Sequence, residues 1–316
     1  MRNPLVRVLD WVAAPFAALA GIFLRLVRMA GLDVLPMCRH ALFAAGLLPV
    51  RRHYYEPFPE GLASAKVRAL PGMHWNLEAQ WKLIDSFSWQ DQIRSLPDED
   101  IAGRRFSADN PNFRGGDADL LYSVIRHFRP ARVVEVGSGH STLVAAMALR
   151  MNADAGSKAT HLCIEPYEMS WLESIGVEVN RSMVQTLPVA FFGNLRENDL
   201  LFIDSSHVVR SGGDVNHMFL EVLPTIAPGV IVHVHDIFSP ADYPRRWVEE
   251  KALLWSEQYL LEAFLAGNAD WEILLSANYL RHQDRERLAD KCPLMERDAE
   301  PGSFYIRRRM SPDRAV

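Results

Sequence analysis

Short apolar runs alternate with helical patterns through the middle of the chain. The five runs cover 131–136, 161–164, about 177–184, 199–203 and 229–234, and polar residues follow each of them. Strand-like runs separated by helical segments are typical of βαβ units. This region is therefore predicted to be α/β, with a doubly wound and mostly parallel sheet.

Two more apolar runs follow, and they extend the predicted sheet to seven strands. Residues 271–280 are expected to form the sixth strand and residues 303–307 the seventh. A long helical pattern covers 246–266, between the fifth and sixth strands. Asp117 opens another helical pattern before the first strand, where an acidic side chain complements the helix dipole.

The first fifty residues differ from the rest and are predicted to form two or three helices. Residues 11–24 carry no charge, but this stretch is shorter than the roughly 20 residues of a membrane-spanning helix. Residues 1–31 hold four arginines and one aspartate, a net charge of +3 that leaves −8 for the remainder. Three interpretations stay open: a helical cap on the core, a helix at a membrane surface, or a helix that docks a partner.

The patterns divide the chain into four parts. They are an apolar, basic helical extension (1–50), an irregular cap or lid region (51–106), a cofactor-binding α/β domain (107–309) and a frayed tail (310–316). Within the second part, His53, Tyr54 and Tyr55 form an aromatic polar cluster that could act as a lid.

Composition narrows the class of protein. Hydrophobic residues make up 49% and charged residues 23% of 316, which is ordinary for a globular protein. A net charge of −5 does not indicate the basic surface that a nucleic-acid-binding protein needs. Three widely spaced cysteines without a CxxC pair indicate that the protein is located in a reducing cytoplasm. Any membrane contact is then expected at the inner membrane surface. Oligomeric state is left open, a homo-oligomer included.

A glycine loop follows the first predicted strand and opens a helix. Gly137 and Gly139 permit the close backbone approach that a nucleotide-like ligand needs. Glu135, an acid inside an otherwise apolar strand, favours a partner with positive charge or hydroxyl donors, such as S-adenosylmethionine, over a pyrophosphate. The loop residues expected at the cofactor are Glu135, Gly137, Ser138, Gly139, Ser141 and Thr142.

The other strands also end in polar side chains, at the edge where open α/β sheets bind their ligands. Glu165 ends the second strand, where an acid accepts hydrogen bonds from ribose hydroxyls. Gln185 follows the third and could meet an adenine edge. Asp204 ends the fourth strand, where it is expected to contact both the cofactor and the acceptor.

Four side chains at the last two of these strand ends are the catalytic candidates: Asp204, His207, His235 and Asp236. Asp204, His207 and Asp236 are predicted to bind Mg²⁺ or a related divalent ion, which two carboxylates and an imidazole suit. Alternatively, His207 or His235 acts as a general base without a metal. In a purely structural interpretation, Asp204 caps a helix and His235 is a polar residue whose hydrogen bonds are satisfied at the strand end.

Neighbouring polar residues are ambiguous. Asp214 could join the metal site or cap a helix after two glycines. Gln258 and Tyr259 could line an acceptor pocket, although packing of a helix on the sheet explains them as well. His233 is expected to be buried packing.

These motifs resemble the class I S-adenosylmethionine-dependent methyltransferases, and most of all the bacterial branch that includes macrocin-type sugar O-methyltransferases. The resemblance covers residues 107–282 and is carried by 135–142, 164–166, 202–207, 232–236, Asp214 and 255–259. It implies a Rossmann-like methyltransferase sheet with an antiparallel last strand, and acidic metal ligands at the ends of the fourth and fifth strands. Ser141 departs from the family pattern, in which many members have a third glycine.

The expected function is S-adenosylmethionine-dependent O-methylation of a small or glycosidic acceptor, assisted by a divalent metal. The alternatives are a metal-independent N- or O-methyltransferase with a histidine base, and a non-catalytic cofactor-binding scaffold that docks through its N-terminal helices. A nicotinamide-dependent dehydrogenase is disfavoured. Thr142 occupies the third glycine position of that fingerprint, and Glu165 comes later than its acid.

Overall fold

A computed structural model describes residues 4–51, 55–57, 67–167 and 169–310. The tail at 311–316 and the side chains of His53 and Tyr54 lie outside the described residues. The chain divides into two compact units. One comprises residues 1–63 and 245–254, and the other comprises residues 64–244 and 255–316.

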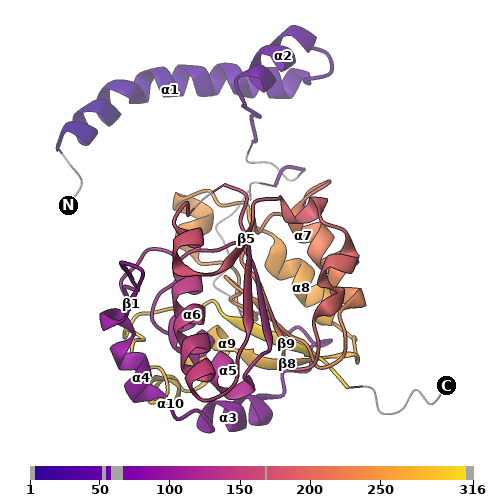
Figure 1. Ribbon diagram of the computed structural model, residues 1–316. Coiled ribbons are helices and arrows are strands. Elements are labelled where there is room, and N and C mark those ends of the chain that lie inside the picture. Colours follow the sequence, from indigo (N-terminus) through magenta and orange to yellow (C-terminus); the bar gives the residue numbers. More distant parts are fainter. Residues whose placement is uncertain (1–3, 52–54, 58–66, 168, 311–316) are drawn as a thin grey trace. The chain divides into compact units, whose positions relative to one another are not determined.

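The second unit is built around a seven-stranded sheet (Figure 1). The strands are β3 (Arg132–Val136), β4 (Thr160–Ile164), β5 (Glu178–Asn180), β6 (Leu200–Ile203), β7 (Ile231–Val234), β8 (Trp271–Ser276) and β9 (Phe304–Arg308). Their order is β5-β4-β3-β6-β7-β9-β8. The first five are parallel, whereas β9 runs antiparallel to both β7 and β8. The predicted doubly wound, mostly parallel seven-stranded fold is confirmed.

Ten α-helices are described. They are α1 (Pro4–Ala30), α2 (Pro36–Ala44), α3 (Leu77–Asp85), α4 (Gln90–Ser95), α5 (Asp117–Phe128), α6 (His140–Asp154), α7 (Asp214–His217), α8 (Glu257–Leu265), α9 (Ala277–Gln283) and α10 (Arg285–Ala289). Short 3₁₀ or π turns occupy Leu96–Asp98, Leu172–Ile175, Val184–Thr186, Val189–Asn194, Met218–Val222, Leu223–Thr225 and Arg246–Glu250. A small hairpin pairs β1 (Asp100–Ile101) with β2 (Arg104–Arg105).

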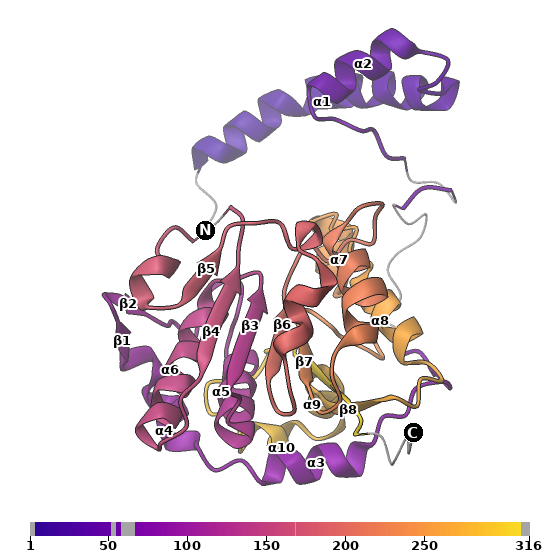
Figure 2. The same ribbon diagram turned by 45° about the vertical axis from the view of Figure 1, so that its right-hand side comes forward.

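Alternation of side chains along the strands produces an apolar core on each face of the sheet. Val133 of β3 packs with α5 and α6, whereas Val134 and Val136 pack on the opposite face with α7 and α8. Both views show these helix pairs on opposite sides of the sheet (Figures 1 and 2). Because side chains alternate with a period of two, the parity of a residue decides which layer it enters.

Two elements predicted from the sequence have wrong boundaries. The helix expected over 246–266 is interrupted, since Ala252 has φ +52°. Helix α8 begins only where the backbone N–H groups of Ser256 and Glu257 donate to the carbonyl of His207 (2.8 and 3.0 Å). The strand expected over 271–280 ends at Ser276, whose N–H and hydroxyl both donate to the Gln80 carboxamide oxygen (2.7 and 2.8 Å). In both places a tertiary contact overrides the local pattern.

The first unit contains α1 and α2, in the region where helices were expected. The segment Val6–Ala30 is long and apolar enough to cross a membrane by length and composition. The uncharged run of 14 residues counted in the sequence is thus part of a longer apolar helix.

Candidate active site

A cavity of about 420 Å³ opens at the carboxyl ends of the parallel strands. Its lining residues come from the ends of β3, β4 and β6, the turn after β5, and the start of α7: Val136, Gly137, Ile164, Glu165, Pro166, Tyr167, Met183, Val184, Gln185, Asp204, Ser205, Ser206, Arg210 and Asp214. This is the edge at which open α/β sheets bind their ligands.

Gly137 joins three strand ends beside this cavity. Its N–H donates to the carbonyl of Ile164 (3.0 Å), while the N–H of Asp204 donates to the carbonyl of Val136 (2.8 Å). A Cβ at Gly137 would lie 1.8 Å from the carbonyl oxygen of Asp204, and φ is +80°. Only glycine fits here, because any side chain would push β6 away from β3.

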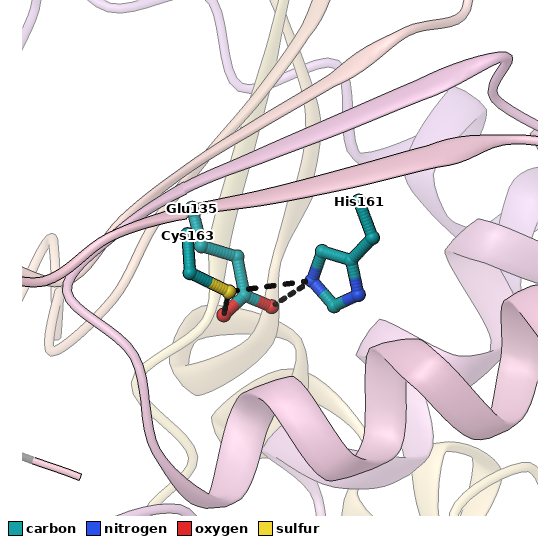
Figure 3. A group of neighbouring side chains, drawn as sticks. All are labelled: Glu135, His161 and Cys163. Carbon is teal, nitrogen blue, oxygen red and sulfur yellow. Dashed lines mark hydrogen bonds and ion pairs between the residues drawn. The ribbon is translucent and has the colours of Figure 1, made fainter. Parts of the chain in front are cut away.

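Glu135 does not line the cavity. It lies on the face of the sheet that α6 covers, next to His161 and Cys163 of β4 (Figure 3). The Thr142 hydroxyl donates to Glu135 Oε2 (2.6 Å), and the Gly139 N–H donates to Thr142 Oγ1 (3.0 Å). Glu135 shares the parity of Val133 and therefore enters the layer under α6, where it fixes the start of this helix.

None of the remaining predicted loop residues lines the cavity. Ser141 and Thr142 are buried in the first turn of α6, and Gly139 precedes that turn. Ser138 donates its N–H to Glu165 Oε2 at 3.3 Å.

Glu165 and Gln185 both line the cavity, as the sequence placed them. The Glu165 carboxylate also accepts the N–H of Tyr167 through Oε1 (3.0 Å). Together with the bond from Ser138, this contact fixes the carboxylate at the cavity wall. Its orientation is thus set by backbone donors of two loops.

Asp204, His207 and Asp236 converge beside the cavity. One ligand atom from each residue lies within 4.8 Å of the others. His207 Nε2 is 3.2 Å from Asp204 Oδ1 and 3.7 Å from Asp236 Oδ2. His207 and Asp236 have φ of +59° and +58°, a conformation that is costly for residues with a side chain and that clusters at functional sites.

Glu257, at the start of α8, was not predicted as a site residue. It contacts His207 on the side of the imidazole that faces away from the two aspartates. Its fully buried carboxylate accepts the Nδ1–H of His207 at 2.8 Å. That bond leaves Nε2 directed at the two aspartates. An acid in the first turn of a helix is ordinary in a sequence. Only the contact of α8 with the His207 carbonyl brings Glu257 to the imidazole.

His235 lies beneath the same aspartates. Its Nδ1 is 3.4 Å from Asp204 Oδ1 and 3.7 Å from Asp236 Oδ1, and its Nε2 is 3.7 Å from Asp117 Oδ2. Asp117 is a second residue that sequence reasoning assigned only to a helix start. It accepts two hydrogen bonds from Ser303, so it ties α5 to the strand β9 region.

The cluster perturbs the protonation of its members. Burial alone would lower the pKa of His207, but its hydrogen bonds to Asp204 and Glu257 outweigh burial and raise the pKa to about 10. Burial likewise opposes the charge of His235, yet the carboxylates of Asp236 and Asp204 hold its pKa well above the usual value. Burial raises the pKa of Asp236 to about 6. The pKa of Asp204 is lowered, because the charge on His235 and the hydrogen bond from His207 outweigh its desolvation.

Asp214 is not among the three clustered residues. Its carboxylate accepts the N–H and the hydroxyl of Ser206 (2.7 and 2.6 Å) and so shapes the loop after β6 at the cavity wall. Gln258 is fully buried and bonds the backbone of Phe238 and Ala241, while Tyr259 is 41% exposed. His233 is buried and stacks on Tyr305 at 4.1 Å between ring centroids.

Comparison with known proteins gives one match to a family model. Residues 134–237 match the family model described as a methyltransferase domain. No curated protein matches the sequence. Two solved structures are similar at low identity. One is an O-methyltransferase from Bacillus cereus in complex with SAH (13% identity, 74% of this chain and 91% of that chain, TM-score 0.38).

The other is a putative methyltransferase from Thermobifida fusca YX (11% identity, 76% of this chain and 96% of that chain, TM-score 0.40). The match to the family model includes the glycine loop, Glu165 and both strand ends with clustered carboxylates. Residues 134–237 are therefore similar to a methyltransferase domain, and the mostly parallel sheet that contains them has the topology expected of one.

Proposed function

We propose that this protein transfers a methyl group from S-adenosylmethionine to a hydroxyl of a small or glycosidic acceptor, with a divalent metal ion at Asp204, His207 and Asp236. The observation that carries the proposal is the convergence of these ligand atoms within 4.8 Å, at the edge of the cofactor-sized cavity that Asp204 also lines. A donor and an acceptor bound there would be neighbours.

The residues of the cluster fit a divalent ion. Two carboxylates and one imidazole suit Mg²⁺, Mn²⁺ or a related metal. The Glu257–His207 pair adds the carboxylate that metal-bound histidines usually have behind them. It fixes the tautomer in which Nε2 is free for the ion. When bound, such an ion would lower the pKa of the acceptor hydroxyl and orient it.

The cofactor would occupy the cavity at the ends of β3, β4 and β6. Glu165 would accept hydrogen bonds from the ribose hydroxyls and Gln185 would meet the adenine edge, since both side chains line the wall. Gly137 would let the cofactor approach the backbone. Ser138 and Gly139 would contribute backbone rather than side chains, while Glu135, Ser141 and Thr142 would act by holding the start of α6.

Methyl transfer breaks the bond between the sulfonium sulfur and the methyl carbon and forms a bond from that carbon to the acceptor oxygen. The hydroxyl proton must leave as this bond forms. In this proposal Nε2 of His207 would face the metal ion, so this imidazole would not take the proton. The Asp236 carboxylate, 3.7 Å from His207 Nε2, would be the proton acceptor within the cluster.

An aromatic side chain borders the cluster. The indole ring of Trp255 lies 4.2 Å from the imidazole of His207 between centroids, which places an apolar plane next to the polar ligands. Such a plane can pack on an aromatic ring. The resemblance to sugar O-methyltransferases adds glycosidic acceptors to the candidates.

Calorimetric titration with S-adenosylmethionine tests the proposal most directly. Wild-type protein should bind saturably, and Glu165→Ala should weaken binding by about tenfold, the effect of one lost charge-assisted contact of about 1.4 kcal/mol. Glu178→Ala, an exposed acid on the neighbouring β5, is the matched control and should bind like wild type. Failure of well-folded wild-type protein to bind, with and without Mg²⁺, would refute the cofactor assignment.

The metal is tested separately. Release of S-adenosylhomocysteine with a hydroxylated acceptor panel should stop when the protein is treated with a chelator and resume when Mg²⁺ or Mn²⁺ is added. Turnover that persists in excess chelator would show that the metal-independent mechanism holds. Binding of cofactor without turnover of any acceptor would favour the scaffold alternative.

A further inference from the structure

Helix α1 exposes an unusual amount of apolar side chain. Its exposed large residues, each between 54% and 82% accessible, are Val6, Val8, Leu9, Trp11, Val12, Phe16, Leu19, Ile22, Phe23, Leu26 and Met29. Within Val6–Ala30 the most apolar window of 18 residues has a mean hydropathy of 1.7, and only 6% of that window is buried. A contiguous apolar surface of this size is normally covered by a ligand, a partner or a membrane.

The polar and apolar residues of α1 lie on opposite sides. One side carries Arg7, Asp10, Ala14, Ala17, Gly21, Arg25 and Arg28, spaced three or four residues apart. The other carries Leu9, Val12, Phe16, Leu19, Phe23 and Leu26 with the same spacing. At 3.6 residues per turn these two rows are half a turn apart, so large apolar side chains lie on one side and charged or small side chains on the other.

The charges favour a bilayer surface over a transmembrane position. Arg7 and Arg25 are separated by 18 residues, which is five full turns, and therefore point in the same direction. The uncharged run between Asp10 and Arg25 has 14 residues and is about 21 Å long, whereas the hydrocarbon core is about 30 Å thick. A helix lying in the membrane plane keeps both arginines at the headgroups and buries only the opposite side.

The sequence of α1 argues against a coiled coil with a second copy. Such a pair buries a narrow seam that is flanked by charged residues. Here the positions beside the row from Leu9 to Leu26 are Val8, Ala13, Pro15, Ala20 and Ile22, none of them charged. Trp11, at 82% exposure, would also remain in water in that arrangement.

We propose that α1 binds in the plane of an anionic lipid bilayer, with Phe16, Leu19 and Phe23 in the acyl region and Arg7 and Arg25 at the headgroups. This is the behaviour of interfacial amphipathic helices with basic polar sides. The helix would hold the methyltransferase at a membrane surface. The proposal is independent of the proposed acceptor and metal.

Flotation of the full-length protein with preformed vesicles tests the proposal. Vesicles of phosphatidylcholine with 30% phosphatidylglycerol should carry the wild type, and vesicles of phosphatidylcholine alone should carry at least fivefold less. Phe16→Ser with Phe23→Ser should reduce binding by more than tenfold, since two large apolar side chains leave the buried side. Ala14→Ser with Ala17→Ser, the same change on the polar side, should bind like wild type.

Arg7→Gln with Arg25→Gln should weaken binding to anionic vesicles by about tenfold or more and remove most of its salt dependence. Cofactor binding by each variant, measured by calorimetry, controls for folding and should be unchanged.

Three outcomes would overturn the proposal. The first is a wild type that stays in solution with both vesicle types. The second is a dimer in lipid-free solution that Phe16→Ser with Phe23→Ser dissociates without any change in flotation. The third is wild-type protein that resists extraction from vesicles at alkaline pH and is cleaved by protease on both sides of the bilayer, because α1 would then span it.

Discussion

Among the described residues, two groups of side chains contain the residue types that bind metals, and they lie in different surroundings. Glu135, His161 and Cys163 lie inside the layer between the sheet and α6 (Figure 3). Asp204, His207 and Asp236 lie where β6 and β7 end, beside the cavity.

The first group makes its contacts within the layer that surrounds it. Glu135 accepts the Thr142 hydroxyl and has His161 Nε2 at 3.2 Å, and burial with the nearby Glu135 charge raises the pKa of the Cys163 thiol far above its usual range. A neutral thiol is a poor metal ligand. The group therefore serves the attachment of α6 to the sheet.

The second group is open on one side. The Asp204 side chain is 30% exposed and that of Asp236 is 16% exposed, while Glu257 closes the side away from the cavity. Similar residue types thus stabilise the fold in one place and offer a site in the other, because the second group lies beside the cavity at the strand ends and the first does not.

The largest effect is expected from Asp236→Asn. The change removes one negative charge from the open group while keeping its size. We expect kcat/KM to fall by about 10²–10⁴-fold, the range for loss of a group that receives a proton in the transition state. Release of S-adenosylhomocysteine at saturating cofactor measures it.

Cofactor affinity should stay within about twofold, because Asp236 is not among the cavity-lining residues. Asp290→Asn, an exposed position, serves as the control. A variant with wild-type kcat/KM would show that the cluster of Asp204, His207 and Asp236 takes no part in the reaction.

The next effect is expected from Glu257→Gln. The amide still accepts the Nδ1–H of His207 but no longer supplies a charge to orient and polarise the ring. Loss of such a partner weakens metal binding by about 10–100-fold. Titration of metal-free protein with Mn²⁺ measures it, with unchanged S-adenosylmethionine affinity as the internal control. An unchanged Mn²⁺ affinity would mean that Glu257 only supports α8.

The smallest effect on activity is expected from Glu135→Gln, in the buried group that Glu135 forms with His161 and Cys163. Its cost should appear in stability, at about 1–3 kcal/mol, because buried hydrogen bonds to a charged group are lost. Thermal unfolding should show a Tm lower by several degrees, while S-adenosylmethionine affinity changes less than twofold. A large loss of cofactor affinity at unchanged Tm would contradict this and restore Glu135 to the cofactor site.

The strands of the sheet could be predicted from the sequence because their signals are local. Apolar runs, glycines and polar strand ends recur between 131 and 236, and each strand of a parallel sheet carries its own signal. The same locality places Glu165, Gln185, Asp204 and Asp236 at one edge, because the carboxyl ends of parallel strands meet there.

The features that the sequence missed depend on contacts across long separations. Glu257 reaches His207 over 50 residues, and the start of α8 is set by the carbonyl of His207 rather than by helix propensity. Ser276 ends β8 because it bonds Gln80, 196 residues earlier. No local pattern carries such information.

The sequence alone determined the α/β class, the strand order along the chain and the residues at each strand end, since these follow from periodicity and glycine chemistry. The tertiary structure decided that Glu135 belongs to the layer under α6, that Asp214 shapes a loop, and that Glu257 holds His207. The physical reason is that a residue's type fixes what it can bond, whereas the packing of distant elements fixes which partner comes within reach.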